Sequence, residues 1–275
     1  MYSSLLIKII VSMRKLSLFL IIIFVLLLIE SFSSPINSKK TNIFIPTVSF
    51  FWNDWENWSE GHVPYIDENV ELSSGSIVQL YSPGISTIVG MLNITDGCVF
   101  TVYSELFSKN TTTIAGSLLM FANVQINNFY LDNGLIWIMN NASLHSDQII
   151  SLKNNDLIIV GPQTISNIYS IVINNSKLIL LQKTKLFIKD YLQTFNGTLV
   201  THYNSTINDI GLLRGETLSF FGKIFLDCDM QIKIKNKCLP IISATNLLHI
   251  YVPIVDVCGY MIKYLLNNNT ITACF

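Results

Sequence analysis

The sequence lacks the short motifs that mark the common enzyme classes. It has no glycine-rich phosphate-binding loop, no Gly-x-Ser-x-Gly elbow and no Cys-x-x-Cys pair. Its four histidines, His62, His145, His202 and His249, have no spacing typical of metal ligands, so each is interpreted as a surface or strand residue. The motifs therefore predict no catalytic residue, no metal ligand and no cofactor.

Charge is scarce as well, because only 13% of the residues are charged. Apolar residues make up 50% of the chain, and the abundance of aliphatic and β-branched side chains favours strands with one face packed inward. The formal net charge is −1, and it becomes −3 when the first 33 residues, with three basic and one acidic side chain, are removed. Nucleic acid is an unfavourable partner at that charge.

The amino terminus has the pattern of a secretory signal peptide. Arg14 and Lys15 precede an unbroken apolar run of twelve residues, and Ser31 and Ser33 supply the small side chains of a cleavage site. Because a membrane span needs roughly 20 apolar residues, we predict cleavage after Ser33 and no stable membrane span in the mature chain. Retention of the segment as a signal anchor is the alternative.

A short run of apolar residues restarts about every twenty residues between residues 77 and 239, at spacings of 17 to 22. Most restarts follow a turn pair such as Asn133-Gly134, whose residues reach positive φ at little cost. Such a period is typical of a β-solenoid, in which each coil pairs its strands with the coils above and below. The restarts fall at Ile77, Val99, Leu118, Leu135, Leu157, Leu178, Leu199, Leu218 and Leu239.

We therefore predict an all-β fold, a right-handed parallel β-helix of about nine coils with an N-terminal aromatic cap. The expected organisation is a signal peptide at 1–33, an N-terminal segment with a Trp-rich cap at 34–76, coils at 77–249 and closing strands at 250–275. Trp52, Trp55 and Trp58 could form a stacking platform for sugar rings or a lid over the first coil, and we favour the lid.

Both ends of the predicted solenoid resemble known secreted proteins. Residues 50–64 read FFWNDWENWSEGHVP, and Asp67, Val70, Leu72, Gly75 and Val78 follow. This stretch resembles the entrance motif of secreted β-helix proteins and the opening of the eight-glycine domain, whose later glycines are mostly absent here. Residues 239–244 and 259–271 resemble the closing strands of bacterial adhesin solenoids and of amoeboid surface proteins. The resemblance implies a surface or matrix protein, and it assigns no catalytic residue in this chain.

One polar column emerges when the coils are aligned by spacing. Its members are separated by 20, 23, 19 and 20 residues, and successive coils lie about 4.8 Å apart. Carboxylates on adjacent coils would bind a cation such as Ca²⁺ or serve a glycan-cleaving enzyme, with Asp190, Asp209 and Asp229 as the speculative cation site. The alternative that we favour is a row of corner residues that hydrogen-bond the local backbone. The column comprises Asp147, Asn167, Asp190, Asp209 and Asp229.

Five cysteines and eight glycosylation sequons fit an oxidising, extracellular compartment. Local spacing favours the disulfide pairs Cys228–Cys238 and Cys258–Cys274, and leaves Cys98 as a buried free thiol or an intermolecular partner. The sequons are at Asn57, Asn93, Asn110, Asn141, Asn174, Asn196, Asn204 and Asn268.

The sequence as a whole indicates a secreted, glycosylated solenoid that acts as a non-catalytic extracellular matrix or cell-surface interaction protein. Its partner would be an extracellular protein or a carbohydrate, with no role for nucleic acid. Two alternatives stay open. One is a polysaccharide lyase or glycoside hydrolase that uses the stacked aspartates, and the other is a signal-anchored membrane protein.

Overall fold

The structure is a computed structural model that describes residues 40–275 except 140, 152, 154, 163, 195, 205–208, 229–237, 252–253, 257–262, 268 and 275. The predicted signal peptide lies outside the described residues. Residues from Thr41 onward form one unit of the chain, built from strands and a single 3-10 turn, η1 (Trp55–Asn57), as far as it is described. In that part of the chain no helix has the length and apolar character needed to cross a membrane.

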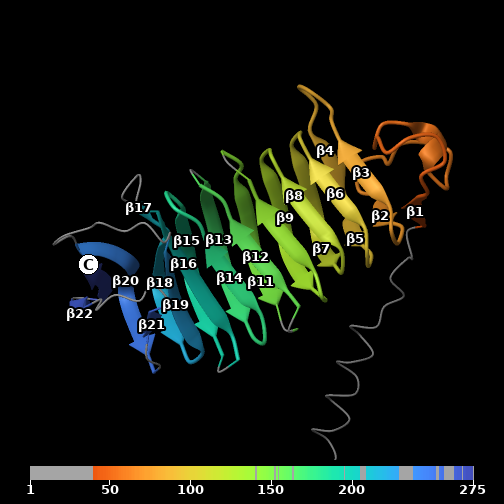
Figure 1. Cartoon of the computed structure of the whole chain (residues 1–275). Coiled ribbons are helices and arrows are strands. Elements are labelled where there is room, and N and C mark those ends of the chain that lie inside the picture. The colour runs from red at the N-terminus through yellow and green to blue at the C-terminus, as the bar shows by residue number, and fades with distance from the viewer. Residues whose placement is uncertain are drawn as a thin grey trace, which may run out of the picture. The chain divides into compact units, whose positions relative to one another are not determined.

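The strands form two long sheets that run side by side along the molecule (Figure 1). The larger sheet contains β1 (Thr41–Phe44), β2 (Asn69–Leu72), β4 (Thr87–Val89), β5 (Met91–Ile94), β7 (Leu106–Ile114), β9 (Val124–Leu131), β11 (Leu144–Ser151), β13 (Ile165–Ile173), β15 (Lys185–Gln193), β18 (Leu212–Phe220), β20 (Cys238–Ile250), β22 (Lys263–Asn267) and β23 (Thr270–Cys274). The smaller sheet contains β3 (Ile77–Leu80), β6 (Val99–Val102), β8 (Ser117–Met120), β10 (Leu135–Ile138), β12 (Leu157–Val160), β14 (Lys177–Leu180), β16 (Thr198–Asn204), β17 (Asp209–Ile210), β19 (Lys223–Cys228) and β21 (Ile254–Asp256).

Each coil contributes one strand to each sheet, and neighbouring coils pair in parallel, so the predicted β-solenoid is confirmed. It has about seven turns instead of the predicted nine. The restarts predicted at Leu218 and Leu239 are wrong, because both residues lie in the larger sheet, in β18 and β20. Arg214 and Gly215, a pair that in sequence resembles the other turn pairs, lie inside β18, and the next strand of the smaller sheet begins at Lys223.

The four-residue strands of the smaller sheet alternate between inward and outward side chains, as strand geometry requires. Their second residues stack in register from coil to coil and are almost completely buried, which builds the continuous core that a solenoid needs. This inward row comprises Val78, Phe100, Leu118, Ile136, Ile158, Leu178, Leu199 and Ile224.

The longer strands of the larger sheet bend in the middle. In β15, Leu186 and Ile188 are buried before the bend and Tyr191 and Gln193 after it, so the inward phase shifts at residues 189–190. The side chains at the bend therefore lie on the outside of the coil. This phase shift makes spacing along the sequence a poor guide to position on a coil.

The residue that precedes each of the strands β3, β6, β8, β10, β12, β14, β16 and β19 lies in a tight, buried corner. The main-chain N–H at the start of each coil's strand donates to the carbonyl of the corner residue one coil earlier, so these residues stack. A Cβ added at Gly134 would overlap the main-chain oxygen of Ile114, which explains the glycine there. Cys98 is free and buried, as predicted, because the corner accepts its small side chain. The corner residues are Ser76, Cys98, Gly116, Gly134, Asp156, Ser176, Gly197 and Gly222.

Asp156 is the one charged residue in this corner row, and the structure compensates its burial with hydrogen bonds. Its carboxylate accepts from the main-chain N–H of Gly134 at 3.0 Å, from the Ser151 hydroxyl at 3.1 Å and from the Lys153 N–H at 3.0 Å. These bonds join one coil to the preceding one and satisfy a side chain that is only 1% exposed.

Main chain from the amino-terminal segment covers the outer edges of the first strands. The Trp52 N–H donates to the Gln79 carbonyl in β3 at 2.9 Å, and the Ser59 N–H donates to the Ile43 carbonyl in β1 at 2.9 Å. Trp52 and Trp58 are buried, and the Trp52 ring stacks on Phe100 at 5.5 Å between centroids. These contacts join the segment to the core and occupy edges that would otherwise expose backbone groups.

Candidate functional site

The predicted aspartate column does not form among the described side chains. Asp190 pairs in register with Ser170 on one side and Thr217 on the other. Asp209 lies in β17 of the smaller sheet, where Asn204 is its antiparallel partner, and Asp229 lies outside the described residues. Asp190 and Asp209 thus belong to different sheets, and the cation site predicted for Asp190, Asp209 and Asp229 stays a prediction.

Asp147 and Asn167, the first two residues of the predicted column, do not pair across their strands either. Asn167 pairs with His145 on the neighbouring coil, whereas Asp147 is two residues further along that strand, at the bend. Coil lengths vary by a few residues, so a spacing of about twenty does not give equal positions on successive coils. Within the described residues, no three His, Cys, Asp or Glu side chains are grouped so that they could hold a metal ion.

The tryptophan platform considered from the sequence is likewise not formed. Trp52 and Trp58 are 1% and 4% exposed, which leaves only Trp55 with an open ring. The Trp58 indole N–H donates to the Trp52 carbonyl at 2.7 Å, so even the polar edge of that ring is used inside the protein. Sugar rings would find no row of open faces on these three side chains.

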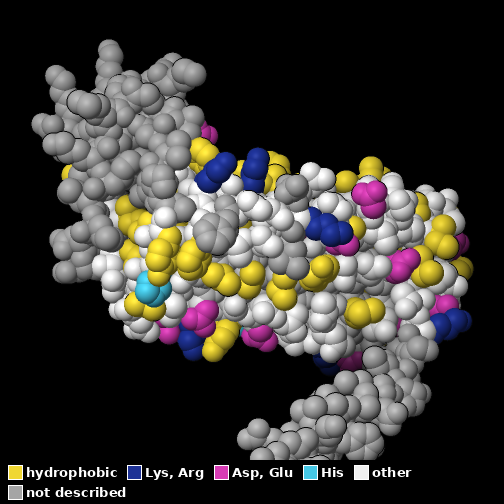
Figure 2. Space-filling view, turned by 90° about the horizontal axis from the view of Figure 1, so that it is seen from below, with side chains coloured by type: hydrophobic (Ala, Val, Ile, Leu, Met, Phe, Trp, Pro, Cys, Tyr) yellow, Lys and Arg dark blue, Asp and Glu magenta, His cyan; other side chains and the backbone are white. Residues whose placement is uncertain are grey.

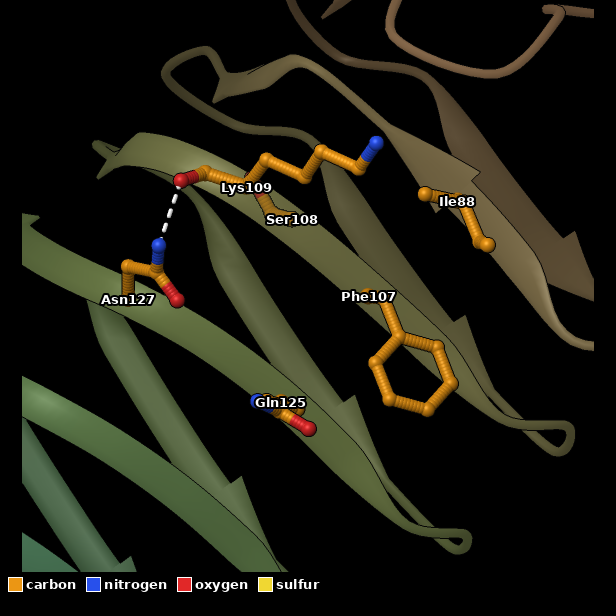
Figure 3. Close-up of a pocket in the computed structure, with 6 residues that line it drawn as sticks. All are labelled: Ile88, Phe107, Ser108, Lys109, Gln125 and Asn127. Atoms are coloured by element: carbon orange, nitrogen blue, oxygen red, sulfur yellow. Dashed lines mark hydrogen bonds between the residues drawn. The ribbon is translucent and has the colours of Figure 1, made fainter.

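A shallow hollow of about 230 Å³ lies on the outer face of β4, β7 and β9 (Figure 3). Ile88 and Phe107 form its apolar side, and the Asn127 side-chain amide donates to the Lys109 carbonyl at 2.6 Å. The Lys109 ammonium pairs with the Asp67 carboxylate at 2.5 Å, so this charge is already balanced. The hollow offers a surface contact and lacks converging reactive groups.

A second hollow of about 280 Å³ lies on the same sheet, across β11, β13, β15 and β18. Lys189 lies 4.4 Å from the centroid of the Tyr169 ring, and its ammonium donates to the Tyr169 hydroxyl at 3.1 Å, which raises the pKa of Lys189. Asp147, Glu216 and Phe187 complete a surface with both signs of charge.

The largest of these three hollows, about 480 Å³, lies at a corner of the early coils, and we call it the corner cleft. Its walls are the loop between β3 and β4, which projects beyond the neighbouring corners (Figure 1), and the turns that follow β6 and β8. The Ser82 N–H donates to the Ser104 hydroxyl at 2.6 Å, which ties the loop to the next coil. The lining residues are 82–86, 103–105, 121–123 and Asn141.

Three aromatic side chains on successive coils form a row that we call the aromatic column; Tyr103 and Phe121 line the corner cleft, and Tyr81 directly precedes its lining residue Ser82. Tyr81, Tyr103 and Phe121 directly follow β3, β6 and β8 and are 60%, 43% and 44% exposed. The ring centroids of Tyr81 and Tyr103 are 6.5 Å apart, and those of Tyr103 and Phe121 are 5.0 Å apart. This row was not predicted from the sequence, although an aromatic residue directly after three successive strands is a signal for it.

Backbone hydrogen bonds fix the aromatic column to the solenoid. The Tyr103 N–H donates to the Leu80 carbonyl at 2.9 Å, and the Phe121 N–H donates to the Val102 carbonyl at 2.9 Å. Because the same bonds continue the sheet pairing from coil to coil, the rings are attached to a rigid part of the fold.

The polar groups of the corner cleft are mostly uncharged. The Ser86 hydroxyl donates to the Glu105 carboxylate at 2.6 Å, and the Ser143 hydroxyl donates to Asn123 Oδ1 at 2.8 Å. Among the described residues the Asn123 side-chain amide N–H groups have no partner. Glu105 is the single ionisable side chain among the lining residues apart from the Tyr103 hydroxyl.

The structure separates the predicted glycosylation sites by accessibility. Asn57 is 1% exposed, its Oδ1 accepts from the Thr47 and Val48 N–H groups, and its Nδ2 donates to the Ser49 hydroxyl at 3.1 Å. A glycan on Nδ2 is incompatible with these contacts. Asn110, Asn141 and Asn196 are exposed, Asn93 and Asn174 are half-buried, and the side chains of Asn204 and Asn268 are outside the description.

In the carboxyl-terminal region the strand register brings together different cysteines from those that the sequence spacing favoured. Cys238 is disulfide-bonded. It opens β20 directly opposite Cys274 of β23 in an antiparallel pair. The side chains of Cys228 and Cys274 and the whole of Cys258 lie outside the described residues, so the pairs Cys228–Cys238 and Cys258–Cys274 are untested. The strand register favours Cys238 with Cys274 in their place.

The fold and its clefts thus define a parallel β-solenoid with open surface hollows. Comparisons with family models, with curated proteins and with solved structures find no match to this chain. The resemblance of its two ends to secreted and surface solenoids therefore stays a prediction.

Proposed function

We propose that this chain is a secreted, glycosylated β-solenoid that acts as a non-catalytic extracellular matrix or cell-surface interaction protein. The observation that carries the proposal is the backbone placement of two acidic residues that a glycan-cleaving enzyme of this architecture would need. Asp190 and Asp209 belong to different sheets. A glycosidase places its two carboxyl groups within roughly 5 to 9.5 Å of each other on either side of one bond.

The surface supports an interaction role. Figure 2 shows one long side of the solenoid, where hydrophobic side chains lie along the length of the molecule between polar ones and charges of both signs are scattered. The hollows on the outer faces are shallow and open, which suits contacts with an extended partner better than enclosure of a small substrate.

The proposal includes a capping role for the amino-terminal segment. Residues 50–59 hydrogen-bond the outer edges of β1 and β3, and Trp52 packs on Phe100. A segment in that place would keep the first strands from pairing with another molecule, which an extracellular solenoid at high local concentration requires.

The test has two parts, secretion and turnover. Expression of the full chain in a eukaryotic secretory host should release a glycosylated product into the medium, with Ser34 as its first residue. The purified product, incubated with a panel of polysaccharides with calcium or with a chelator, should release no reducing ends and no unsaturated products.

Two outcomes would overturn this proposal. Turnover that disappears in Asp209→Asn would make the chain a polysaccharide-cleaving enzyme. A full-length product that stays in the membrane fraction would make it a signal-anchored protein.

A further inference from the structure

We propose that the corner cleft and its aromatic column bind an uncharged carbohydrate chain. This inference rests on the proposed interaction function, because it names the class of partner. The ligand chain would run along the solenoid axis, over Tyr81, Tyr103 and Phe121, with its hydroxyl groups directed at the polar lining of the cleft.

The aromatic column leaves much of its apolar surface exposed, although the rings of Tyr103 and Phe121 stack on each other. Burial of large aromatic side chains is strongly favourable, so rings that remain 43% to 60% exposed on three adjacent coils form a costly surface for a free protein. Sugar rings present apolar C–H groups on one side and hydroxyl groups around their edges. A ligand that repeats such rings matches a protein surface that repeats aromatic side chains.

The polar lining fits hydroxyl groups. The Asn123 amide offers N–H donors, Glu105 offers a carboxylate oxygen beyond the one that Ser86 occupies, and the Ser86 hydroxyl, whose proton goes to Glu105, can still accept. Amide, hydroxyl and carboxylate groups are the set that a polyhydroxylated ligand requires, since each sugar hydroxyl is both a donor and an acceptor.

Charge separates this cleft from the other two hollows. Lys109 lines the first hollow and Lys189 lines the second, whereas the corner cleft has no basic side chain among its lining residues. An anionic polysaccharide would face Glu105 with no cation to balance it. The lining therefore selects a neutral chain over a uronate or sulfated one.

The site is also rigid and accessible. The N–H groups of Tyr103 and Phe121 are bonded to the preceding coil, so little conformational entropy is lost when a ligand binds. Asn141 lies at the rim with φ of 63° and is exposed, so a glycan on its sequon would lie beside the cleft. Replacing Asn141 by Gly removes that sequon without strain, because glycine adopts positive φ freely.

The experiment measures binding of neutral cello-, chito-, manno- and galacto-oligosaccharides to the secreted protein by calorimetry, with oligogalacturonate as the charged comparison. We expect at least one neutral oligosaccharide to bind with Kd near 1 mM or tighter, and oligogalacturonate to bind more weakly. The double substitution Tyr103→Ala with Phe121→Ala should weaken binding at least tenfold, or about 1.4 kcal/mol. Tyr169→Ala is the matched control, since Tyr169 is 52% exposed and lies outside the cleft, and it should bind as the wild type does.

Each outcome decides the proposal. Binding seen only in Asn141→Gly also supports it, with the protein's own glycan as the competitor. No binding to any neutral oligosaccharide by wild type and Asn141→Gly, or equal losses in the column variant and Tyr169→Ala, would overturn it when circular dichroism shows that all variants are folded. If the protein is secreted and cleaves no polysaccharide but binds no neutral oligosaccharide, the sugar-binding proposal is wrong and the proposed interaction function is unaffected.

Discussion

Two buried threonines should respond in opposite directions to the same substitution. Thr201 in β16 has no exposed surface, and its hydroxyl has no hydrogen-bond partner among the described residues. Its neighbours in register are Leu180 and Leu226, both fully buried. Valine has nearly the same shape, so Thr201→Val replaces an unpaired hydroxyl in an apolar row by a methyl group.

The comparison residue is Thr184, which is 1% exposed and precedes β15. Its hydroxyl donates to the carbonyl oxygen of Gly161 at 2.8 Å and to that of Val160 at 3.1 Å. Thr184→Val removes the donor of these hydrogen bonds at a position that is as buried as Thr201.

Burying an unpaired hydroxyl costs about 1–3 kcal/mol, and a satisfied hydrogen bond contributes about 1 kcal/mol. We therefore expect Thr201→Val to raise the free energy of unfolding by about 1 kcal/mol or more, and Thr184→Val to lower it by about 1 kcal/mol. For a chain of this size, each 1 kcal/mol shifts Tm by roughly 2–4 °C. The two variants should therefore differ in Tm by roughly 4–8 °C.

Thermal unfolding followed by circular dichroism measures both shifts, and guanidinium midpoints from two probes check that the coils unfold together. If both substitutions move Tm in the same direction, the hydrogen-bonding states assigned to the two hydroxyl groups are wrong.

Three further predictions follow from single residues. Asp156→Ala should lower the free energy of unfolding by about 3 kcal/mol, because three donors lose their acceptor, and a guanidinium midpoint close to that of the wild type would contradict this. Glycopeptide mapping of the secreted chain should find Asn57 unmodified and Asn110 occupied, and a glycan on Asn57 would show that the amino-terminal segment folds differently. Peptide mapping without reduction should recover Cys238 linked to Cys274, since their strands pair them directly, and recovery of Cys238 with any other cysteine would refute that pairing.

The coil period was predictable because it depends on signals that each span only a few residues. Runs such as residues 157–160 alternate inward and outward side chains, and turn residues such as Asn133 at φ of 63° separate them. Both signals act over a few residues, so the sequence determined the parallel solenoid and most coil starts up to Thr198. The prediction failed after that point, because Leu218 lies in β18 of the larger sheet, and the next parallel strand of the smaller sheet begins only at Lys223.

The place of a residue around its coil was not predictable, because small differences in the lengths of successive coils add up along the sequence. Spacing alone put Asp190 and Asp209 in one column, whereas the strand bend and the longer coil put them on different sheets. Accessibility was equally hidden, since the sequons at Asn57 and Asn110 look the same in sequence although only the second is exposed.

The sequence by itself thus determined the repeat and the strand alternation. The tertiary structure alone decided which side chains share a surface, including the row of Tyr81, Tyr103 and Phe121 and the cleft that the last two line. The physical reason is that backbone hydrogen bonds between coils set the register, and register depends on pairing between residues about twenty apart and not on any local pattern.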